Sequence, residues 1–354
     1  MKILIATPLY PPDIGGPATY SKKIADELPK YGIQTKVLSF GSVRRLPTGI
    51  RHFVFFLRVI KESRGCDVLF ALDNVSVGIP AAAASLITRK PLIIRLGGDF
   101  LWEDAVERGG IHISMRQFYS TRAKQYRPML QAFIRSVFIR SVFVIFSTEF
   151  QRDINMMFYD IPQKRARIVE NPNPHYDIPL SHTNTREIIY AGRFIILKNP
   201  MSLIDAVADE AFSSTRLVLI GEGYQKEHLV RRARELGISE RIEIVQPISH
   251  DKLLARIAQG LYCVLPSFTD VSPNLALECI ALKKSVIVSR ETGLQKHYPD
   301  LLYIDPFSIN DMRDKMKLLL DDRQRLVYEE RLSTLPTRNW SDAARELCSI
   351  INEV

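Results

Sequence analysis

Short apolar runs alternate with longer amphipathic stretches along almost the whole chain. Runs of this length predict buried strands, and apolar residues three and four positions apart predict helices between them. Strands that alternate with helices favour a doubly wound, mostly parallel sheet, so we expect an α/β fold. Strands are expected at residues 2–7, 34–40, 67–71, 91–95, 142–147, 167–170, 188–191, 216–220, 242–245, 261–265 and 285–289.

One polar segment interrupts this alternation. Residues 171–187 carry three prolines and no apolar periodicity, which is typical of a linker. A length of 354 residues also suits two domains, each large enough for its own core. We therefore expect one domain at residues 1–175 and a second at 186–335, with a separate amphipathic helix at about 338–354.

The composition is that of a globular protein with reduced thiols. Hydrophobic residues make up 46% of the chain, and the four cysteines are scattered, which favours a cytosolic protein over a disulfide framework. The seven histidines are also dispersed, and no Asp-x-Asp pair ends a predicted strand, so no metal site is expected. The strand at residues 2–7 begins at once and prolines follow it, which does not resemble a signal peptide.

Positive charge is concentrated in the first half of the chain. Residues 1–180 carry 25 Lys and Arg against 15 Asp and Glu, whereas the remainder carries 23 against 24. No acidic residue occurs between Glu107 and Glu149. A basic face implies an anionic partner, such as a membrane surface, a nucleic acid or an acidic saccharide. The alternative is a core helix whose basic side lies in water.

Two carboxylates follow a buried strand in the second half. Asp270 comes after the strand at 261–265, and Glu278 lies within the next helix, for which Ser272 is the expected N-cap and Pro273 the first residue. A helix N-terminus offers free N–H groups to a phosphate, and nearby carboxylates can accept hydrogen bonds from hydroxyl groups. The alternative is an ordinary strand–helix unit whose acidic side chains lie in solvent.

Two cations follow another predicted strand. Arg193 and Lys198 lie five residues apart after the strand at 188–191. Across a turn between strand and helix, such a pair can converge on one diphosphate, because arginine supplies a planar fork of donors and lysine a point charge. The alternative is two solvated surface cations.

Three further loops could carry chemistry. Gly15 and Gly16 follow the first strand, where a glycine pair lets the backbone approach a ligand or makes a tight turn. Gly221 follows the strand at 216–220 and is explained equally by a turn. Asp99 ends the strand at 91–95 and could contact a sugar or cap the helix that follows.

Three of these motifs together resemble a known family. They are Pro-Pro-Asp-x-Gly-Gly at 11–16, Gly-Arg-x4-Lys-Asn at 192–199 and Asp-x7-Glu at 270–278. This set is similar to the signatures of the retaining GT-B glycosyltransferases of family 4. The resemblance implies two Rossmann-like doubly wound domains that face each other across a cleft, and a C-terminal helix that crosses back to the N-terminal domain.

The same resemblance assigns roles to the charged residues. Arg193 and Lys198 would hold the diphosphate of the donor. Glu278 would accept hydrogen bonds from the ribose, and Asp270 from the donor hexose, although the family usually has Glu at this first position. Asp99 stands in the loop where many members carry a His near the reacting sugar, and this chain has no His there.

Backbone groups complete the site that the family implies. Gly15 and Gly16 would offer N–H groups to the cleft, and Gly221 would border the nucleotide base. At the start of the helix near Glu278, Pro273 has no N–H, which leaves those of Asn274 and Leu275 for the phosphates.

The expected function is therefore a retaining, metal-independent transfer of a hexose from a nucleotide-diphosphate sugar to a hydroxyl group. The donor acts as co-substrate and no cofactor is expected. The acceptor would be a saccharide or a lipid-linked saccharide, as in cell-envelope polysaccharide biosynthesis. We expect a cytoplasmic protein, with contact to the inner face of the cell membrane through the basic region at 108–142, and no nucleic-acid partner.

Two other classes remain open from sequence. One is a nucleotide-sugar epimerase or a phosphorylase with the same fold. The other is a non-enzymatic protein that binds saccharide or nucleic acid through the basic half.

Overall fold

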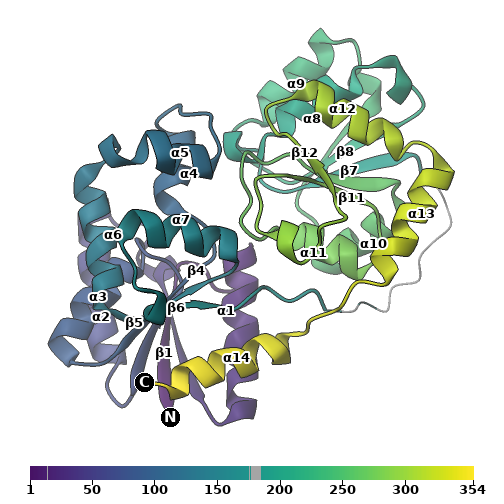
Figure 1. Cartoon of the computed structure of the whole chain (residues 1–354). Coiled ribbons are helices and arrows are strands. Elements are labelled where there is room, and N and C mark those ends of the chain that lie inside the picture. Colours follow the sequence, from purple (N-terminus) through teal and green to yellow (C-terminus); the bar gives the residue numbers. More distant parts are fainter. Residues whose placement is uncertain (14, 175, 177–184) are drawn as a thin grey trace. The chain divides into compact units, whose positions relative to one another are not determined.

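The computed structural model describes residues 1–13, 15–174, 176 and 185–354 (Figure 1). It divides into two compact units. The expected linker at 171–187 lies partly outside the described residues. Unit 1 comprises Met1–Trp102, Tyr119–Pro172 and Asn339–Val354, and unit 2 comprises Glu103–Phe118 and Asn173–Arg338.

Unit 1 contains a sheet of six parallel strands in the order β2-β1-β3-β4-β5-β6. All five residues of β4 are buried, as expected for a parallel sheet that helices cover on both faces. Its strands are β1 (Lys2–Thr7), β2 (Gln34–Ser39), β3 (Val68–Ala71), β4 (Leu92–Leu96), β5 (Ser141–Phe146) and β6 (Ala166–Ile168).

Helices lie on both faces of this sheet (Figure 1). Helices α2, α3 and α6 lie side by side on one face, and α1 and α14 pack together on the other. The helices are α1 (Gly16–Glu27), α2 (Thr48–Glu62), α3 (Gly78–Thr88), α6 (Pro128–Arg140), α7 (Glu149–Tyr159) and α14 (Trp340–Asn352), with 3-10 turns η1 (Leu28–Tyr31), η2 (Phe40–Val43), η3 (Ala123–Gln125) and η4 (Gln163–Arg165).

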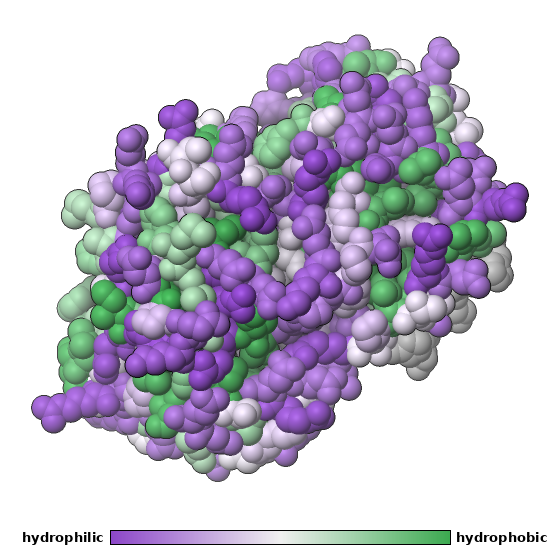
Figure 2. Space-filling view, viewed as in Figure 1, coloured by the Kyte–Doolittle hydropathy of each residue, from purple (hydrophilic) through white to green (hydrophobic). Residues whose placement is uncertain are grey.

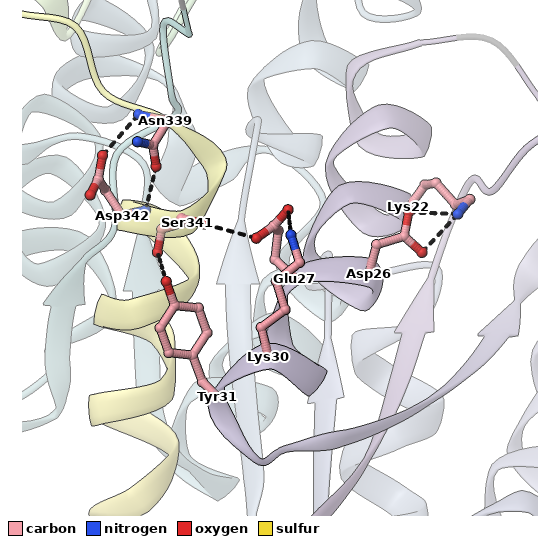
Figure 3. Close-up of polar contacts among 8 residues, drawn as sticks. All are labelled: Lys22, Asp26, Glu27, Lys30, Tyr31, Asn339, Ser341 and Asp342. Carbon is pink, nitrogen blue, oxygen red and sulfur yellow. Dashed lines mark hydrogen bonds and ion pairs between the residues drawn. The ribbon is translucent and has the colours of Figure 1, made fainter.

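The C-terminal helix α14 belongs to unit 1. A capping box between Asn339 and Asp342 fixes its start, and its apolar side, which includes Leu347, is buried in the core of unit 1. The Tyr31 hydroxyl donates to the Ser341 carbonyl at 3.1 Å, and the Ser341 hydroxyl donates to Glu27 at 3.0 Å (Figure 3). The expected return of the last helix to the unit that holds the N-terminus is confirmed.

Unit 2 contains a second sheet of six parallel strands, in the order β12-β11-β10-β7-β8-β9. This is the strand order of a dinucleotide-binding fold, with β7 as its first strand and β10 as its fourth. The strands are β7 (Glu187–Ala191), β8 (Arg216–Ile220), β9 (Ile242–Val245), β10 (Tyr262–Leu265), β11 (Val286–Ser289) and β12 (Leu302–Ile304).

The helices of unit 2 also cover both faces of its sheet (Figure 1). They are α8 (Pro200–Val207), α9 (Lys226–Glu235), α10 (His250–Gln259), α11 (Asn274–Ala281), α12 (Ile309–Leu318) and α13 (Asp322–Ser333), with 3-10 turns η5 (Ile196–Lys198), η6 (Glu210–Phe212), η7 (Ser239–Arg241) and η8 (Leu294–Lys296). Helices α4 (Phe100–Glu107) and α5 (Met115–Thr121) contribute residues to both units.

The predicted doubly wound α/β fold is confirmed in both sheets. Every expected strand is present to within two residues at either end. Strand β12 was not predicted, because its three residues are too few to form a recognisable apolar run. In the described part of the chain, no helix is both long enough and apolar enough to cross a membrane.

Candidate functional site

The strand order of unit 2 identifies where a ligand would bind. Strands β7 and β10 are neighbours, and the chain leaves β7 toward β8 on one side and reaches β10 on the other. In open parallel sheets, ligands bind outside the carboxyl ends of the strands at such a switch point. Arg193 and Lys198 follow the carboxyl end of β7, and Asp270 follows that of β10.

Lys198 and Asp270 form an ion pair at this switch point. The ammonium group contacts the Oδ2 atom of Asp270, and the two side chains are 24% and 20% exposed. A backbone bond from the Phe268 N–H to the Leu197 carbonyl, 3.0 Å long, also joins the loops that carry them. Two predicted site residues, 72 positions apart in sequence, are thus brought together.

Asn199 fixes the loop behind Lys198. It adopts a left-handed conformation with φ of 53°, and its side-chain amide donates to the carbonyls of Pro266 at 3.2 Å and Pro306 at 3.0 Å. The loop after β7 is thereby tied to the loops after β10 and β12. Asparagine is one of the few residues that accept this conformation and can also supply the two donors.

Arg193 is exposed and lies next to the same pair of strands. The Tyr190 hydroxyl donates to the Arg193 carbonyl at 2.8 Å. Burial raises the pKa of Tyr190, the charge of Asp270 raises it further, and the charge of Arg193 lowers it. Both charged side chains therefore act on the hydroxyl of Tyr190. Arg193, Lys198 and Asp270 gather at the carboxyl end of β7.

Gly221 and Gly223 have a structural role in the loop after β8. Their φ angles are 151° and 155°, which side chains of L-residues rarely adopt. A Cβ at Gly221 would lie 2.0 Å from the Gly192 carbonyl oxygen, and one at Gly223 would lie 2.3 Å from that of Phe194. These glycines let the loop after β8 pack directly on the backbone of the loop that carries Arg193.

Helix α11 starts one residue later than the sequence predicts. Pro273 is its N-cap and Asn274 its first residue, so the expectation that Ser272 caps the helix and Pro273 opens it is wrong. The extended ψ of 107° at Pro273 explains the shift, because a helical residue needs a negative ψ. The N–H groups of Asn274 and Leu275 lie in the first turn, where the helix itself provides no acceptor.

Glu278 is joined by two residues that the sequence analysis did not identify. The Nε2 atom of His250 lies 3.0 Å from the Oε1 atom of Glu278. The ring of Tyr176 meets the His250 ring edge-on, with centroids 5.9 Å apart. Burial and the nearby charge of Glu278 raise the pKa of Tyr176 to about 12. His250 directly follows the loop after β9. Ligands of parallel sheets bind beyond the carboxyl ends of the strands, so this position could have marked His250 as a candidate site residue.

Asp99 is a helix cap in unit 1. Its carboxylate accepts hydrogen bonds from the Trp102 N–H at 2.9 Å and from the Tyr119 hydroxyl at 2.8 Å, and the residue is only 2% exposed. Burial raises the pKa of Asp99, and these donors lower it. The capping alternative therefore describes the contacts of Asp99, whereas its role as a sugar contact stays a prediction.

Gly15 and Gly16 lie at the start of α1, beyond the carboxyl end of β1. Gly15 is the N-cap, and its carbonyl accepts the N–H groups of Ala18 at 3.0 Å and Thr19 at 3.1 Å. The neighbours of β1 are β2 and β3, so this loop lies at the switch point of the sheet of unit 1. The role of this glycine pair in binding a ligand stays a prediction.

Among the residues that the structure describes, no group of three or more His, Cys, Asp or Glu side chains could hold a metal ion. The carboxyl edge of unit 2 offers instead two cations, two carboxylates and a helix N-terminus. Such a set can bind a diphosphate and several hydroxyl groups.

Comparison with known proteins identifies a family for the second half of the chain. The family model described as Glycosyl transferases group 1 matches residues 176–333. Alpha-D-kanosaminyltransferase from Streptomyces kanamyceticus is 26% identical over 177 residues, which cover 47% of this chain and 45% of that protein. D-inositol 3-phosphate glycosyltransferase from Corynebacterium glutamicum (strain R) is 26% identical over 200 residues, covering 53% and 47%. The chain thus matches about half the length of these relatives.

A solved structure extends the likeness of the fold to the whole chain. Sucrose-phosphate synthase from Thermosynechococcus elongatus has a TM-score of 0.76 at 14% identity, covering 99% of this chain and 98% of that one. Residues 176–333 are therefore a domain of the group 1 glycosyltransferase family, and the chain as a whole has the GT-B fold of glycosyltransferases.

Proposed function

We propose that this protein transfers a hexose from a nucleoside-diphosphate sugar to a hydroxyl acceptor, with retention at the anomeric carbon and without a metal ion. The observation that carries the proposal is the Lys198–Asp270 ion pair beside Arg193 at the switch point of unit 2. It offers two cations for a diphosphate and a carboxylate for the hydroxyl groups of the sugar.

The main role of these two cations would be to stabilise the charge on the leaving diphosphate. When the bond between the anomeric carbon and the phosphate oxygen breaks, negative charge grows on the leaving diphosphate. Arg193 and Lys198 then stabilise the transition state more than the ground state. The first-turn N–H groups of α11, at Asn274 and Leu275, would contribute in the same way.

The acceptor hydroxyl attacks from the same face that the diphosphate leaves. Its proton passes to the leaving phosphate oxygen as the new glycosidic bond forms, so no protein nucleophile is needed. Asp270 would hold the hexose, and Glu278, supported by His250 at 3.0 Å, would accept hydrogen bonds from the ribose.

A thermal-shift screen tests the donor class. UDP-, GDP- and ADP-sugars are each added to the purified protein, in parallel samples with and without EDTA. We expect one nucleotide to raise Tm by several degrees, since a ligand at 100 times its Kd adds about 2.7 kcal/mol to stability. Absence of a shift with all three donors would contradict the proposal, and a shift that EDTA abolishes would contradict metal independence.

Product analysis separates this function from the same-fold alternatives. An epimerase converts the donor without an acceptor, and a phosphorylase needs inorganic phosphate. A transferase releases a nucleoside diphosphate in proportion to the glycoside formed. The non-enzymatic alternative predicts salt-sensitive binding of an anionic polymer that does not depend on Arg193 and Lys198.

We further propose that the acceptor is lipid-linked and that unit 1 contacts an anionic membrane surface. Helices α2, α3 and α6 expose large apolar side chains among cations, and Figure 2 shows green patches among purple ones over this part of unit 1. The exposed apolar residues include Phe53, Leu57, Leu86, Ile87, Met129 and Phe133. Apolar side chains with nearby Arg and Lys favour an anionic lipid interface.

This surface differs from the expected basic region at 108–142. Residues Glu103–Phe118 belong to unit 2, whereas α2 and α3 add exposed apolar residues that lie outside the basic interval. The cations nearest in sequence to these apolar residues are Arg51 and Arg58 in α2, Arg89 directly after α3, and Arg127 and Arg135 at α6.

Vesicle sedimentation tests this surface. We expect Phe53→Ser with Phe133→Ser to weaken binding to phosphatidylglycerol vesicles roughly 10-fold or more, because each ring would lose about 1.5–3 kcal/mol of apolar burial. Met157→Ser is the control, since Met157 is 83% exposed on α7, outside the three helices. Equal binding of all variants, or no binding by the wild type, would contradict the membrane contact.

A further inference from the structure

The segment Glu103–Phe118, here called the strap, comes from the first half of the sequence but belongs to unit 2. It contains the end of α4 and the start of α5. Its contacts fall on the loops after β7, β8, β10 and β11, which are the four central strands of the unit 2 sheet. The strap therefore runs along the carboxyl edge that holds the candidate site.

At one end of the strap, Glu107 binds the turn that carries Lys198. Its Oε1 atom accepts the Leu197 N–H at 2.7 Å, and its Oε2 atom accepts the Tyr224 hydroxyl. That hydroxyl in turn accepts the Ile196 N–H at 3.3 Å. One carboxylate, directly and through Tyr224, thus satisfies the two N–H groups that open η5, the turn whose last residue is Lys198.

The electrostatics agree with this contact. Burial, together with the hydrogen bond to Glu107, raises the pKa of Tyr224 to about 12, so its hydroxyl remains a donor throughout the physiological range. A carboxylate at the start of a helical turn is also stabilised by the N–H groups that point toward it. Glu107 is therefore placed to hold the turn.

The other end of the strap contacts the loop that carries Asp270. The Met115 N–H donates to the Thr269 hydroxyl at 2.9 Å, and the His112 ring lies 5.9 Å from that of Phe268. Thr269 is the residue before Asp270 and is 2% exposed. The strap thus contacts both loops of the Lys198–Asp270 pair.

A third contact links the strap to Asp270 through Glu291. The Asp270 N–H donates to the Glu291 carbonyl at 3.0 Å. Burial raises the pKa of the Glu291 carboxyl, and Arg116 and the Ser114 hydroxyl lower it because they stabilise its charged form. Both of these residues belong to the strap, so the strap also stabilises Glu291, whose carbonyl accepts the Asp270 N–H.

From these contacts we infer that Glu107 is a positioning residue for Lys198, and that the strap holds the Lys198–Asp270 pair in the geometry for catalysis. The inference rests on the proposed function, in which Lys198 stabilises the leaving diphosphate. Glu107 acts through the η5 turn and does not itself bind the donor.

Loss of the Glu107 carboxylate should affect kcat more than KM. Without it, the Leu197 N–H and the Tyr224 hydroxyl lose their acceptor, and Lys198 is no longer fixed from the N-terminal side of its turn. A displacement of about 1 Å in a catalytic group can lower the rate by up to about 10²-fold. We expect Glu107→Ala to lower kcat roughly 10-fold or more, with KM for the donor changed less than about threefold.

Glu107→Gln separates position from charge. The amide oxygen of glutamine can still accept the Leu197 N–H, and its NH₂ group can donate to the Tyr224 oxygen. We expect this variant to recover most of the activity. Arg108→Ala is the matched control, because Arg108 lies next to Glu107 on the strap, has a side chain that is 72% exposed, and pairs with Asp104 of α4.

A double-mutant cycle with Lys198→Ala tests the mechanism. If Glu107 acts through Lys198, Glu107→Ala should lower kcat little further once Lys198 is absent. Amide hydrogen exchange provides a readout without substrate. Peptides covering residues 195–199 should exchange faster in Glu107→Ala than in the wild type, and at the wild-type rate in Arg108→Ala.

The outcomes separate this inference from the proposed function. Additive losses in the cycle, or wild-type kcat in Glu107→Ala, would overturn the positioning role while leaving the transferase intact. Wild-type kcat in Lys198→Ala would instead overturn the proposed function, and the exchange rates would still show whether Glu107 holds the turn. Non-additive losses with recovery in Glu107→Gln would support the inference.

Discussion

Replacing Lys198 by alanine is expected to lower kcat by roughly 10²–10³-fold, the size of effect seen when one group that stabilises a developing anion is removed. KM for the donor should rise much less, because the charge on the diphosphate that Lys198 meets grows as the glycosidic bond breaks. Initial rates of nucleoside-diphosphate release at several donor concentrations measure both quantities.

The fold should survive this change. The Lys198–Asp270 pair lies on loops beyond the ends of β7 and β10, outside the buried apolar core of unit 2. Lys164→Ala, at an exposed position in η4, is the matched control and should keep full activity. If Lys198→Ala retained wild-type kcat with an unchanged Tm, the site would not be where we place it.

Gly221→Ala is expected to lower the free energy of unfolding by more than about 3 kcal/mol. The new Cβ would lie 2.0 Å from the Gly192 carbonyl oxygen, and the φ of 151° would be strained for any L-residue. Because the colliding atom belongs to the backbone of the loop that carries Arg193, the loop must move. Urea unfolding curves of the two proteins measure the loss.

Gly237→Ala is the comparison for this prediction. Gly237 also has a positive φ, 68°, but a Cβ there would meet nothing within 4 Å. Its loss should be about 1–2 kcal/mol, the cost of the left-handed conformation alone. Equal losses in the two variants would show that the close approach of the two backbones contributes nothing to stability.

Much of the fold could be predicted because the strands of parallel sheets are continuous apolar runs. The site residues on loops after β7 and β10 could be predicted for a related reason: carboxyl ends of neighbouring strands meet at one edge. Lys198 and Asp270 are therefore paired despite their distance in sequence. The chemistry assigned to them remains a proposal.

The contacts that could not be predicted from sequence are those between residues that lie far apart along the chain. Asp99 reads as a polar residue at a strand end, and only the fold reveals the Tyr119 hydroxyl beside it. In the sequence, Glu107 is only the last acidic residue before a basic interval. Nothing in the sequence indicates its contact with Leu197, which lies 90 positions away. His250 differs, because its position beyond β9 was a signal in the sequence, although nothing in its neighbours indicates Glu278 as its partner.

A crystal structure with the nucleoside diphosphate that gives the largest thermal shift tests the donor site most directly. We predict phosphate oxygens within hydrogen-bonding distance of the Lys198 ammonium and the Arg193 guanidinium, at the carboxyl end of β7. A second cationic site provides the alternative: a depression of about 390 Å³ near the amino ends of β7 and β8, lined by Arg186, Arg216 and Arg241 among others. A diphosphate bound there, with Lys198 still paired only to Asp270, would contradict the assignment.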